Sequence, residues 1–175
     1  MIPAVRDATA ADLPDIAALY AHHVRTGLAS FETEPPDLAE MTARFEAVRG
    51  KGFPYLACEI DGRLAGFAYA SSYRTRPAYR FCVEDSVYVH PELAGGGAGR
   101  TLLARLIERC EAIGCRQMVA VIGDSGNAAS IGLHSALGFR MAGTLRSIGF
   151  KHGRWVDSIL MQRALGAGDR SPPDP

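Results

Sequence analysis

The sequence predicts an α/β fold in which one mixed sheet is flanked by helices. Three observations support this prediction: two helical patterns near the N-terminus, a hairpin pattern over residues 55–70, and alternating strand and helix patterns after residue 80. The 175 residues suit one domain that can bury a core of its own. We therefore expect a single domain over residues 1–165. Residues 166–175 are polar and rich in proline, so we expect them to form a disordered tail.

Two helices are expected in the first 50 residues. Thr9 and Asp12 have the spacing of a capping box, and apolar residues recur at helical spacing to about residue 25. Asp37 can cap a second helix, which Gly50 and Gly52 would end. The predicted inward stripe of this second helix is Leu38, Met41, Phe45 and Val48.

The remainder of the chain supplies the sheet and two more helices. Asp61-Gly62 lies between two strand patterns, 55–60 and 63–70, and supplies the positive φ angles of a tight hairpin turn. The expected later elements are a basic loop over 72–80, a strand over 81–89, a helix from Ala98 to about Ile113, an apolar strand of the parallel type over 117–123, a short helix ending at Gly138, and two strands over 140–150 and 154–164 joined near His152-Gly153.

Composition and charge exclude several classes of function. The formal net charge is zero and the pI is about 7.0, so the chain has no electrostatic footprint for nucleic acid. No apolar run approaches the roughly 20 residues that cross a bilayer, and the N-terminus lacks the basic and apolar segments of a signal peptide. We therefore expect a cytoplasmic protein with no nucleic-acid or membrane partner. The four cysteines lack zinc spacing and the histidines form no ligand cluster, so no metal is expected.

A glycine-rich stretch between a strand and a helix is the strongest local signal. It reads Ala94-Gly95-Gly96-Gly97-Ala98-Gly99-Arg100, and it matches neither a P-loop, which needs a lysine, nor the G-x-G-x-x-G fingerprint. Alternate glycines let backbone N–H groups approach a ligand closely, because no Cβ atoms intervene. A helix start of this kind suits a pyrophosphate, and Arg100 adds a charged donor. The alternative is a flexible turn without a ligand.

Longer segments around this stretch carry a family resemblance. Two segments, SVYVHPELAGGGAGRTLL and QMVAVIGDSGNAASIGLHSALGFR, resemble the acetyl-CoA motifs of the GNAT acyltransferase superfamily. Together with AGFAYASSYRTRPAYRFCVED and GFKHGRWVDSILMQ, they resemble its phosphinothricin and methionine sulfoximine N-acetyltransferase branch over about residues 2–164. The resemblance implies a GNAT-type acyl-CoA N-acyltransferase fold, a mostly antiparallel sheet with a splayed strand pair. It also implies a homodimer that detoxifies small amino acid analogues by acetylating their α-amino group with acetyl-CoA, by direct attack in a ternary complex.

The resemblance assigns a set of residues to acetyl-CoA. The strand before the glycines would align with the pantetheine arm, and the residue that begins the short helix near 128 would contact the cofactor. The implied cofactor residues are Val87, Tyr88, Val89, Gly95, Gly96, Gly97, Ala98, Gly99, Arg100, Asn127 and Ser130. The chain departs from the family pattern at Ala94, where glutamine or arginine is usual, so a side-chain donor is lost while the backbone cradle is kept.

Two acidic residues on the strand over 81–89 compete for the role of general base. Period-2 alternation places Glu84 and Asp85 on opposite faces, and a carboxylate within an apolar sheet is costly unless it is paired or functional. The resemblance favours Glu84 as the base that deprotonates the amine. It favours His134 as the acid that protonates the leaving thiolate, and the alternative is a structural helix histidine. A covalent route through Cys82 is a further alternative.

The amine substrate has the least specific signals. A free amino acid needs a cation for its carboxylate, and the loop over 72–80 offers Arg74, Arg76 and Arg80, with Tyr79 beside them. Phe31 lies in a segment that resembles the branch's substrate-side loop. The alternatives are an acetyltransferase of another amine (a polyamine, an aminoglycoside or a protein N-terminus) and a sensor that binds acetyl-CoA without turnover.

Overall fold

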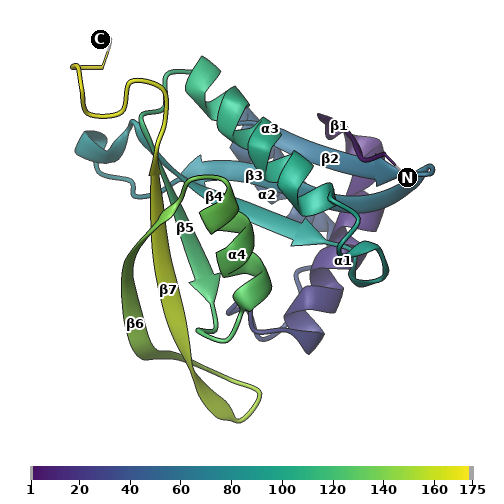
Figure 1. Ribbon diagram of the computed structural model, residues 1–175. Helices are drawn as coiled ribbons and strands as arrows, with labels where there is room; N and C mark the ends of the chain where they lie inside the picture. The colour runs from purple at the N-terminus through teal and green to yellow at the C-terminus, as the bar shows by residue number, and fades with distance from the viewer. Residues whose placement is uncertain (1, 174–175) are drawn as a thin grey trace.

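A seven-stranded sheet in the order β1-β2-β3-β4-β5-β7-β6 organises the computed structural model, which describes residues 2–173. Helices α3 and α4 cover one face of the sheet, and α1 and α2 cover the other (Figure 1). The strands are β1 (Ala4–Asp7), β2 (Tyr55–Ile60), β3 (Arg63–Ser72), β4 (Cys82–Val89), β5 (Gln117–Gly123), β6 (Arg140–Lys151) and β7 (Arg154–Ala164). The helices are α1 (Leu13–Thr26), α2 (Leu38–Gly50), α3 (Ala98–Ala112) and α4 (Ala128–Ala136). The mixed α/β prediction is confirmed.

The N-terminal helices follow their capping signals. Thr9 and Asp12 form the predicted capping box, and Asp37 accepts a hydrogen bond from the Glu40 N–H at the start of α2. The inward stripe of α2 is confirmed except at Leu38, whose side chain is exposed because it lies at the first position of the helix. The sequence analysis missed β1, a four-residue edge strand with mostly exposed side chains.

The predicted splayed strand pair is β4 and β5. The two strands pair in parallel only from Cys82 to Asp85 on β4 and from Gln117 to Ala120 on β5. Beyond that point β4 pairs only with β3, while β5 continues antiparallel to β7. The strand over 117–123 is therefore parallel on one side and antiparallel on the other. Within residues 2–173, the separation leaves one backbone edge of β4 beyond Asp85 without a strand partner.

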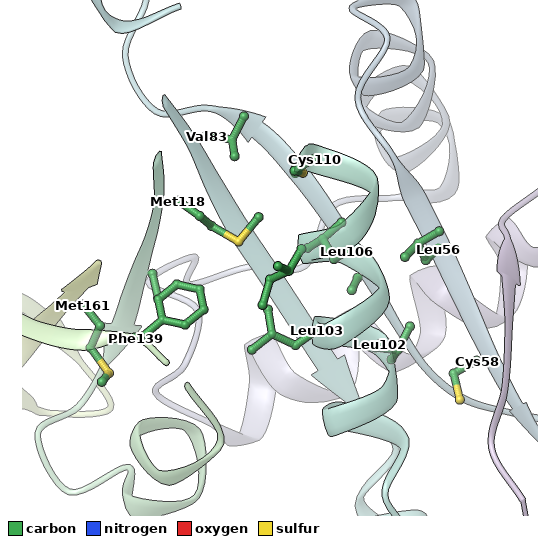
Figure 2. Packing of buried hydrophobic residues seen from close by; sticks show 14 of the residues in the cluster. Leu56, Cys58, Val83, Leu102, Leu103, Leu106, Cys110, Met118, Phe139 and Met161 are labelled. Atoms are coloured by element: carbon green, nitrogen blue, oxygen red, sulfur yellow. The ribbon is translucent and has the colours of Figure 1, made fainter. Parts of the chain in front are cut away.

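Helix α3 packs its apolar side against the centre of the sheet. Figure 2 shows Leu102, Leu103, Leu106 and Cys110 along this side of the helix, with Val83 and Met118 on the strands nearby. The side chains of Leu102, Leu103 and Leu106 are fully buried, as predicted. A second cluster on the other face joins α1, α2 and the aromatic residues of β2 and β3. The two clusters pack on opposite faces of the sheet and so fix the positions of β4 and β5.

The β6–β7 hairpin forms one end of the sheet and reaches past the other strands (Figure 1). His152 and Gly153 have positive φ angles and form its turn, as predicted. The pairing of β6 with β7 shifts register between Leu145 and Gly149. Large apolar side chains are exposed on this hairpin: Met141, Leu145, Ile148, Phe150 and Trp155.

The chain after β7 contacts the domain. The Arg116 guanidinium donates hydrogen bonds to the Ser171 and Pro172 carbonyl oxygens, and the Gly166 N–H donates to Glu111. The division into a domain over 1–165 and a disordered tail over 166–175 stays a prediction, and residues 174 and 175 lie outside the described part. Over residues 2–173, no helix is both long and apolar enough to span a bilayer.

Candidate active site

Two cavities meet where β4 and β5 separate. The larger encloses about 740 Å³ between the end of β4, the glycine stretch and the start of α4. The smaller encloses about 320 Å³ and lies over the middle of β4 and the end of β5. The residues that line both cavities are Ala29, Val87, Tyr88, Gly123, Asn127 and Ser130. A ligand in the larger cavity can therefore reach a second ligand in the smaller one.

The glycine stretch forms the floor of the larger cavity at the start of α3. Gly95 and Gly97 have φ angles of 83° and 87°, which L side chains rarely adopt, and α3 begins at Ala98. The first N–H groups of the helix have no acceptor within it, so they are available to an anion. A Cβ on Gly99 would lie 3.3 Å from the Val89 side chain, so this glycine permits close packing of α3 on β4.

Most of the residues predicted to contact the cofactor line this cavity. They are Val87, Tyr88, Val89, Gly95, Gly97, Ala98, Gly99, Arg100, Asn127 and Ser130. Gly96 lies outside the lining, because its N–H donates to the Leu93 carbonyl oxygen. Ala94 lines the cavity as well, so the position that departs from the family pattern lies at the site itself.

The start of α4 is fixed by Asn127. Its side-chain oxygen accepts a hydrogen bond from the Ser130 N–H at 3.1 Å, and its position also lines both cavities. Asn127 is therefore the N-cap of α4, and the same residue lies at the junction of the two cavities. The segment between β5 and α4 places this cap directly beside the opening between the splayed strands.

Glu84 and Asp85 lie on opposite faces of β4, as the alternation predicts, yet both line the smaller cavity. Glu84 is partly buried, and its pKa is raised by burial and by the neighbouring Asp85 charge, while Arg74 partly offsets the rise. A carboxylate with a raised pKa is a stronger base than an exposed one. Glu84 therefore has the position and the chemistry of a general base.

Asp85 pairs with His134 inside the protein. The Asp85 Oδ2 atom lies 2.9 Å from His134 Nε2, and the two side chains are 3% and 4% exposed. His134 Nδ1 donates to the Ser130 carbonyl oxygen at 2.7 Å. Burial lowers the pKa of His134, but the Asp85 carboxylate and the Ser130 carbonyl outweigh it and raise the pKa above its usual value. The geometry therefore favours an imidazolium that donates from both nitrogens.

Neither nitrogen of His134 faces open space, so a direct transfer to a ligand would require a hydrogen bond to break. The Ser130 hydroxyl offers an indirect path, because its Oγ lies 3.4 Å from His134 Nδ1 and Ser130 lines both cavities. The second carboxylate oxygen of Asp85, Oδ1, is buried and has no hydrogen-bond partner in the described part of the chain.

The predicted substrate residues divide into two groups. Phe31 lines the smaller cavity, as expected for a wall of the amine site. The side chains of Arg74, Arg76, Tyr79 and Arg80 are exposed and outside the lining. Arg80 stacks over the Phe81 ring at 4.4 Å and Arg74 over the Tyr73 ring at 5.1 Å. Of these arginines, Arg74 lies close enough to influence the charge of Glu84.

Cys82 does not have the environment of a nucleophile. Burial and the nearby thiol of Cys115 raise the pKa of Cys82 to about 11, so the thiol is protonated at neutral pH. Its side chain lines neither cavity. These observations contradict the alternative of a covalent acetyl-cysteine route.

Several lining residues were missed by sequence reasoning. His23 on α1 lines the larger cavity, and its Nε2 donates to the Val89 carbonyl oxygen at 2.9 Å, which fixes the end of β4. Gly123, at the end of β5, lines both cavities, and a Cβ there would lie 2.1 Å from the Leu28 carbonyl oxygen. The available signal for Gly123 was a glycine that ends an apolar strand. No local signal marks His23, because its partner lies 66 positions away.

Comparisons with known proteins agree with this geometry. The model of the acetyltransferase (GNAT) family matches residues 16–139. A phosphinothricin N-acetyltransferase of Alcaligenes faecalis is 60% identical over 163 residues, covering 93% of this chain and 83% of that protein. An L-methionine sulfoximine/L-methionine sulfone acetyltransferase of Pseudomonas paraeruginosa is 44% identical over 94% of this chain and 96% of its own length. A crystal structure of a phosphinothricin acetyltransferase from Sinorhizobium meliloti in complex with AcCoA superimposes with a TM-score of 0.96 at 48% identity, covering 99% of this chain and 94% of the other.

Proposed function

The chain belongs to the acetyltransferase (GNAT) family, and we propose that it acetylates the α-amino group of a small amino acid analogue with acetyl-CoA. Phosphinothricin, methionine sulfoximine and methionine sulfone are the substrates on which its relatives are named. One observation carries the proposal: the cavity with the carboxylate of Glu84 opens into the cavity with the free N–H groups of α3. This arrangement places an acceptor amine beside a base and next to a bound thioester.

The proposed mechanism begins with Glu84. Its carboxylate takes a proton from the substrate ammonium group, directly or through a water molecule, and the free amine attacks the thioester carbonyl carbon. Strand β5 no longer pairs with β4 at Val87, Tyr88 and Val89, so some of the backbone N–H groups of these residues lack a strand partner. Those N–H groups would polarise the carbonyl oxygen as it becomes negative. The C–N bond forms, and the C–S bond then breaks.

We propose that His134 supplies the proton for the leaving thiolate through Ser130. Nδ1–H of the imidazolium would pass its proton to Ser130 Oγ as the hydroxyl proton moves to sulfur. For this transfer Nδ1–H must turn from the Ser130 carbonyl oxygen to the hydroxyl, and the Nδ1 to Oγ distance of 3.4 Å must shorten. Catalytic hydrogen bonds are often long before substrates bind. Before the next cycle Glu84 releases its proton to solvent, and His134 takes one up from solvent, which the Asp85 carboxylate favours by raising the pKa of the imidazole.

The carboxylate of an amino acid substrate requires a cation. We propose that at least one of Arg74, Arg76 and Arg80 binds it, with Tyr79 beside them. Arg74 has the best support, because it already influences the charge of Glu84. The mobility of a long arginine side chain allows the guanidinium to turn from its aromatic neighbour to a bound carboxylate.

The test is thiol release from acetyl-CoA with a panel of amines. Methionine sulfone, methionine sulfoximine and phosphinothricin should be turned over, and spermidine, an aminoglycoside and a short peptide should not. Glu84→Gln should lower kcat by on the order of 10²–10⁴ without changing acetyl-CoA affinity. Glu92→Gln is the control, because Glu92 forms only an exposed ion pair with Arg63. Binding of acetyl-CoA without turnover of any amine would favour a sensor.

We propose that two copies of the chain associate through the β6–β7 hairpin. Strand β6 is an edge strand, and the hairpin exposes several large apolar side chains, among them Ile148 and Trp155, a feature typical of interfaces. A dimer should be found by sedimentation, and Trp155→Glu should convert it to a monomer. A wild-type protein that sediments as a monomer at micromolar concentration would refute the association.

We further propose a cytoplasmic location and a role in detoxification. All four cysteines are free, as is usual in a reducing compartment. Acetylation removes the positive charge of an amino acid analogue and so alters how other proteins recognise it. Cell fractionation, together with growth of a deletion strain on methionine sulfoximine, tests both statements.

A further inference from the structure

We propose that Gly149 of β6 is a specificity-determining residue. Because it has no side chain, it leaves the space that the Phe31 ring occupies in the wall of the smaller cavity. The inference rests on the proposed function, in which the smaller cavity receives the amine. It assigns a role in acceptor selection to a residue that lines neither cavity. Gly149 would act through Phe31 and is therefore a positioning residue.

The ring of Phe31 occupies the space that a side chain at position 149 would need. A Cβ on Gly149 would lie 2.5 Å from Cε2, 2.7 Å from Cδ2 and 3.1 Å from Cζ of Phe31. Ordinary contacts of a Cβ lie at 3.4–4 Å, so the ring would have to move by about 1 Å. The backbone of Gly149 does not have a positive φ, so alanine can adopt its conformation. The requirement for glycine at this position therefore comes from the ring.

The opposite side of the ring is also closed. A Cβ on Gly123 of β5 would lie 3.0 Å from Phe31 Cε1, and the Leu28 carbonyl oxygen lies over the same glycine. A ring displaced from β6 therefore has little space toward β5. Its remaining directions are into the cavity, which encloses only about 320 Å³, or out toward solvent.

Hydrogen bonds and an ion pair hold the residues before and after Phe31, Ser30 and Glu32, in place. Lys151 is 4% exposed, and its ammonium group donates to the Ser30 carbonyl oxygen at 2.6 Å. The Ser30 hydroxyl contacts the Tyr20 hydroxyl at 3.0 Å, and Glu32 is paired with Arg44. Because the neighbouring residues are held, a substitution at Gly149 changes the position of the ring and not that of the whole loop.

A substitution at Gly149 should therefore affect the binding of the acceptor through the position of the Phe31 ring. The Phe31 ring lies in the same lining as Glu84, so a bound acceptor that presents its amine to Glu84 has its side chain beside the ring. A ring moved by 1 Å changes the space for that side chain but leaves the larger cavity intact. The expected signature is a change in acceptor selectivity with unchanged use of acetyl-CoA.

The experiment compares Gly149→Ala, Phe31→Ala and the double variant. Gly149→Ala should raise KM for methionine sulfone at least 10-fold, while KM for acetyl-CoA changes less than twofold. Phe31→Ala removes the wall, and in that background Gly149→Ala should have less than a twofold further effect, because no ring remains to displace. Gly143→Ala is the matched control on the same strand, since a Cβ there meets no atom within 4 Å.

The outcomes separate this inference from the proposed function. Wild-type protein that turns over no amino acid analogue refutes the function, and the ring is then followed by NMR of ¹³C-labelled phenylalanine, in which Gly149→Ala but not Gly143→Ala should shift the Phe31 signals. Equal KM in wild type and Gly149→Ala, or effects of the two substitutions that multiply, would overturn the inference. If Gly149→Ala fails to fold, refolding in the Phe31→Ala background supports it, and failure there as well refutes it.

Discussion

The buried pair of Asp85 and His134 makes a prediction about stability that depends on pH. Asp85→Asn keeps the shape of the side chain but removes the charge that faces the imidazole. Breaking a buried ion pair costs about 3–5 kcal/mol. The two side chains are 3% and 4% exposed, so solvent does not screen the loss. Asparagine can still hydrogen-bond to a neutral imidazole, so we expect a cost near the lower end of that range at pH 5.5.

The direction of the pH dependence follows from the raised pKa of His134. A histidine whose pKa is raised by folding contributes stability that is fully present below its unfolded pKa of about 6.5 and is lost as the pH rises through its folded pKa. In Asp85→Asn, burial would dominate and His134 would fold as the neutral form. The difference between wild type and variant should therefore be largest at pH 5.5 and decrease toward pH 9.

The measurements are urea unfolding at both pH values, which gives the free energy of unfolding, and thermal unfolding, which gives Tm, each followed by circular dichroism. At about 2–4 °C per kcal/mol, a cost of about 3 kcal/mol corresponds to a decrease in Tm of about 6–12 °C at pH 5.5. Glu108→Gln, which breaks the exposed pair with Arg105, is the control and should change stability by less than about 0.5 kcal/mol at either pH. A cost that is the same at both pH values, or larger at pH 9, would refute the assignment of an imidazolium.

Three further predictions concern the site. Gly97→Ala places a side chain at a φ of 87°, which costs about 1–2 kcal/mol in that conformation. The free loop should relax out of the conformation that binds the cofactor, and a penalty of that size for returning to it corresponds to a rise of about 5- to 30-fold in KM for acetyl-CoA. Gly132→Ala, whose Cβ would meet no atom within 4 Å among the described residues, should leave this KM unchanged. Ser130→Ala should lower kcat at least 10-fold with little change in either KM, whereas Ser135→Ala, exposed on the same helix, should not. Because the pKa of Glu84 is raised, kcat/KM should increase with pH, and the midpoint of this increase should lie above the usual carboxyl pKa of 4.5. The increase should be absent in Glu84→Gln.

Local signals explain how much of the fold was predicted. The capping box at Thr9, the hairpin turn at Asp61-Gly62 and the apolar side of α3 each depend on residues within a few positions of one another. The glycine stretch and the cap of α4 at Asn127 are local in the same sense, and the residues predicted to contact the cofactor, Gly96 excepted, do line one cavity, although their role stays a prediction. The predicted inward stripe of α2 was wrong at Leu38, because the first residue of a helix can lie beyond the surface on which the rest of the helix packs.

Long-range contacts account for what was missed. Asp85 and His134 lie 49 positions apart, and nothing in either segment shows that the second carboxylate of the pair would meet the histidine. Three segments surround the Phe31 ring: its own loop, the end of β5 at Gly123 and the last residues of β6 at Gly149. A glycine within a strand signals close packing, but the sequence does not identify the atom that packs there.

The end of the pairing between β4 and β5 explains how adjacent carboxylates can take the different roles that we propose for them in one site. Side chains at successive positions of a strand point to opposite faces, so Glu84 and Asp85 would be separated by the sheet if the two strands remained paired. Pairing ends at Asp85 and Ala120, and the gap beyond it admits both faces to one cavity. Glu84 can then act on a substrate from one face while Asp85 holds His134 on the other. Further pairing of β4 with β5 would close the gap and occupy the backbone N–H groups that the proposed mechanism uses.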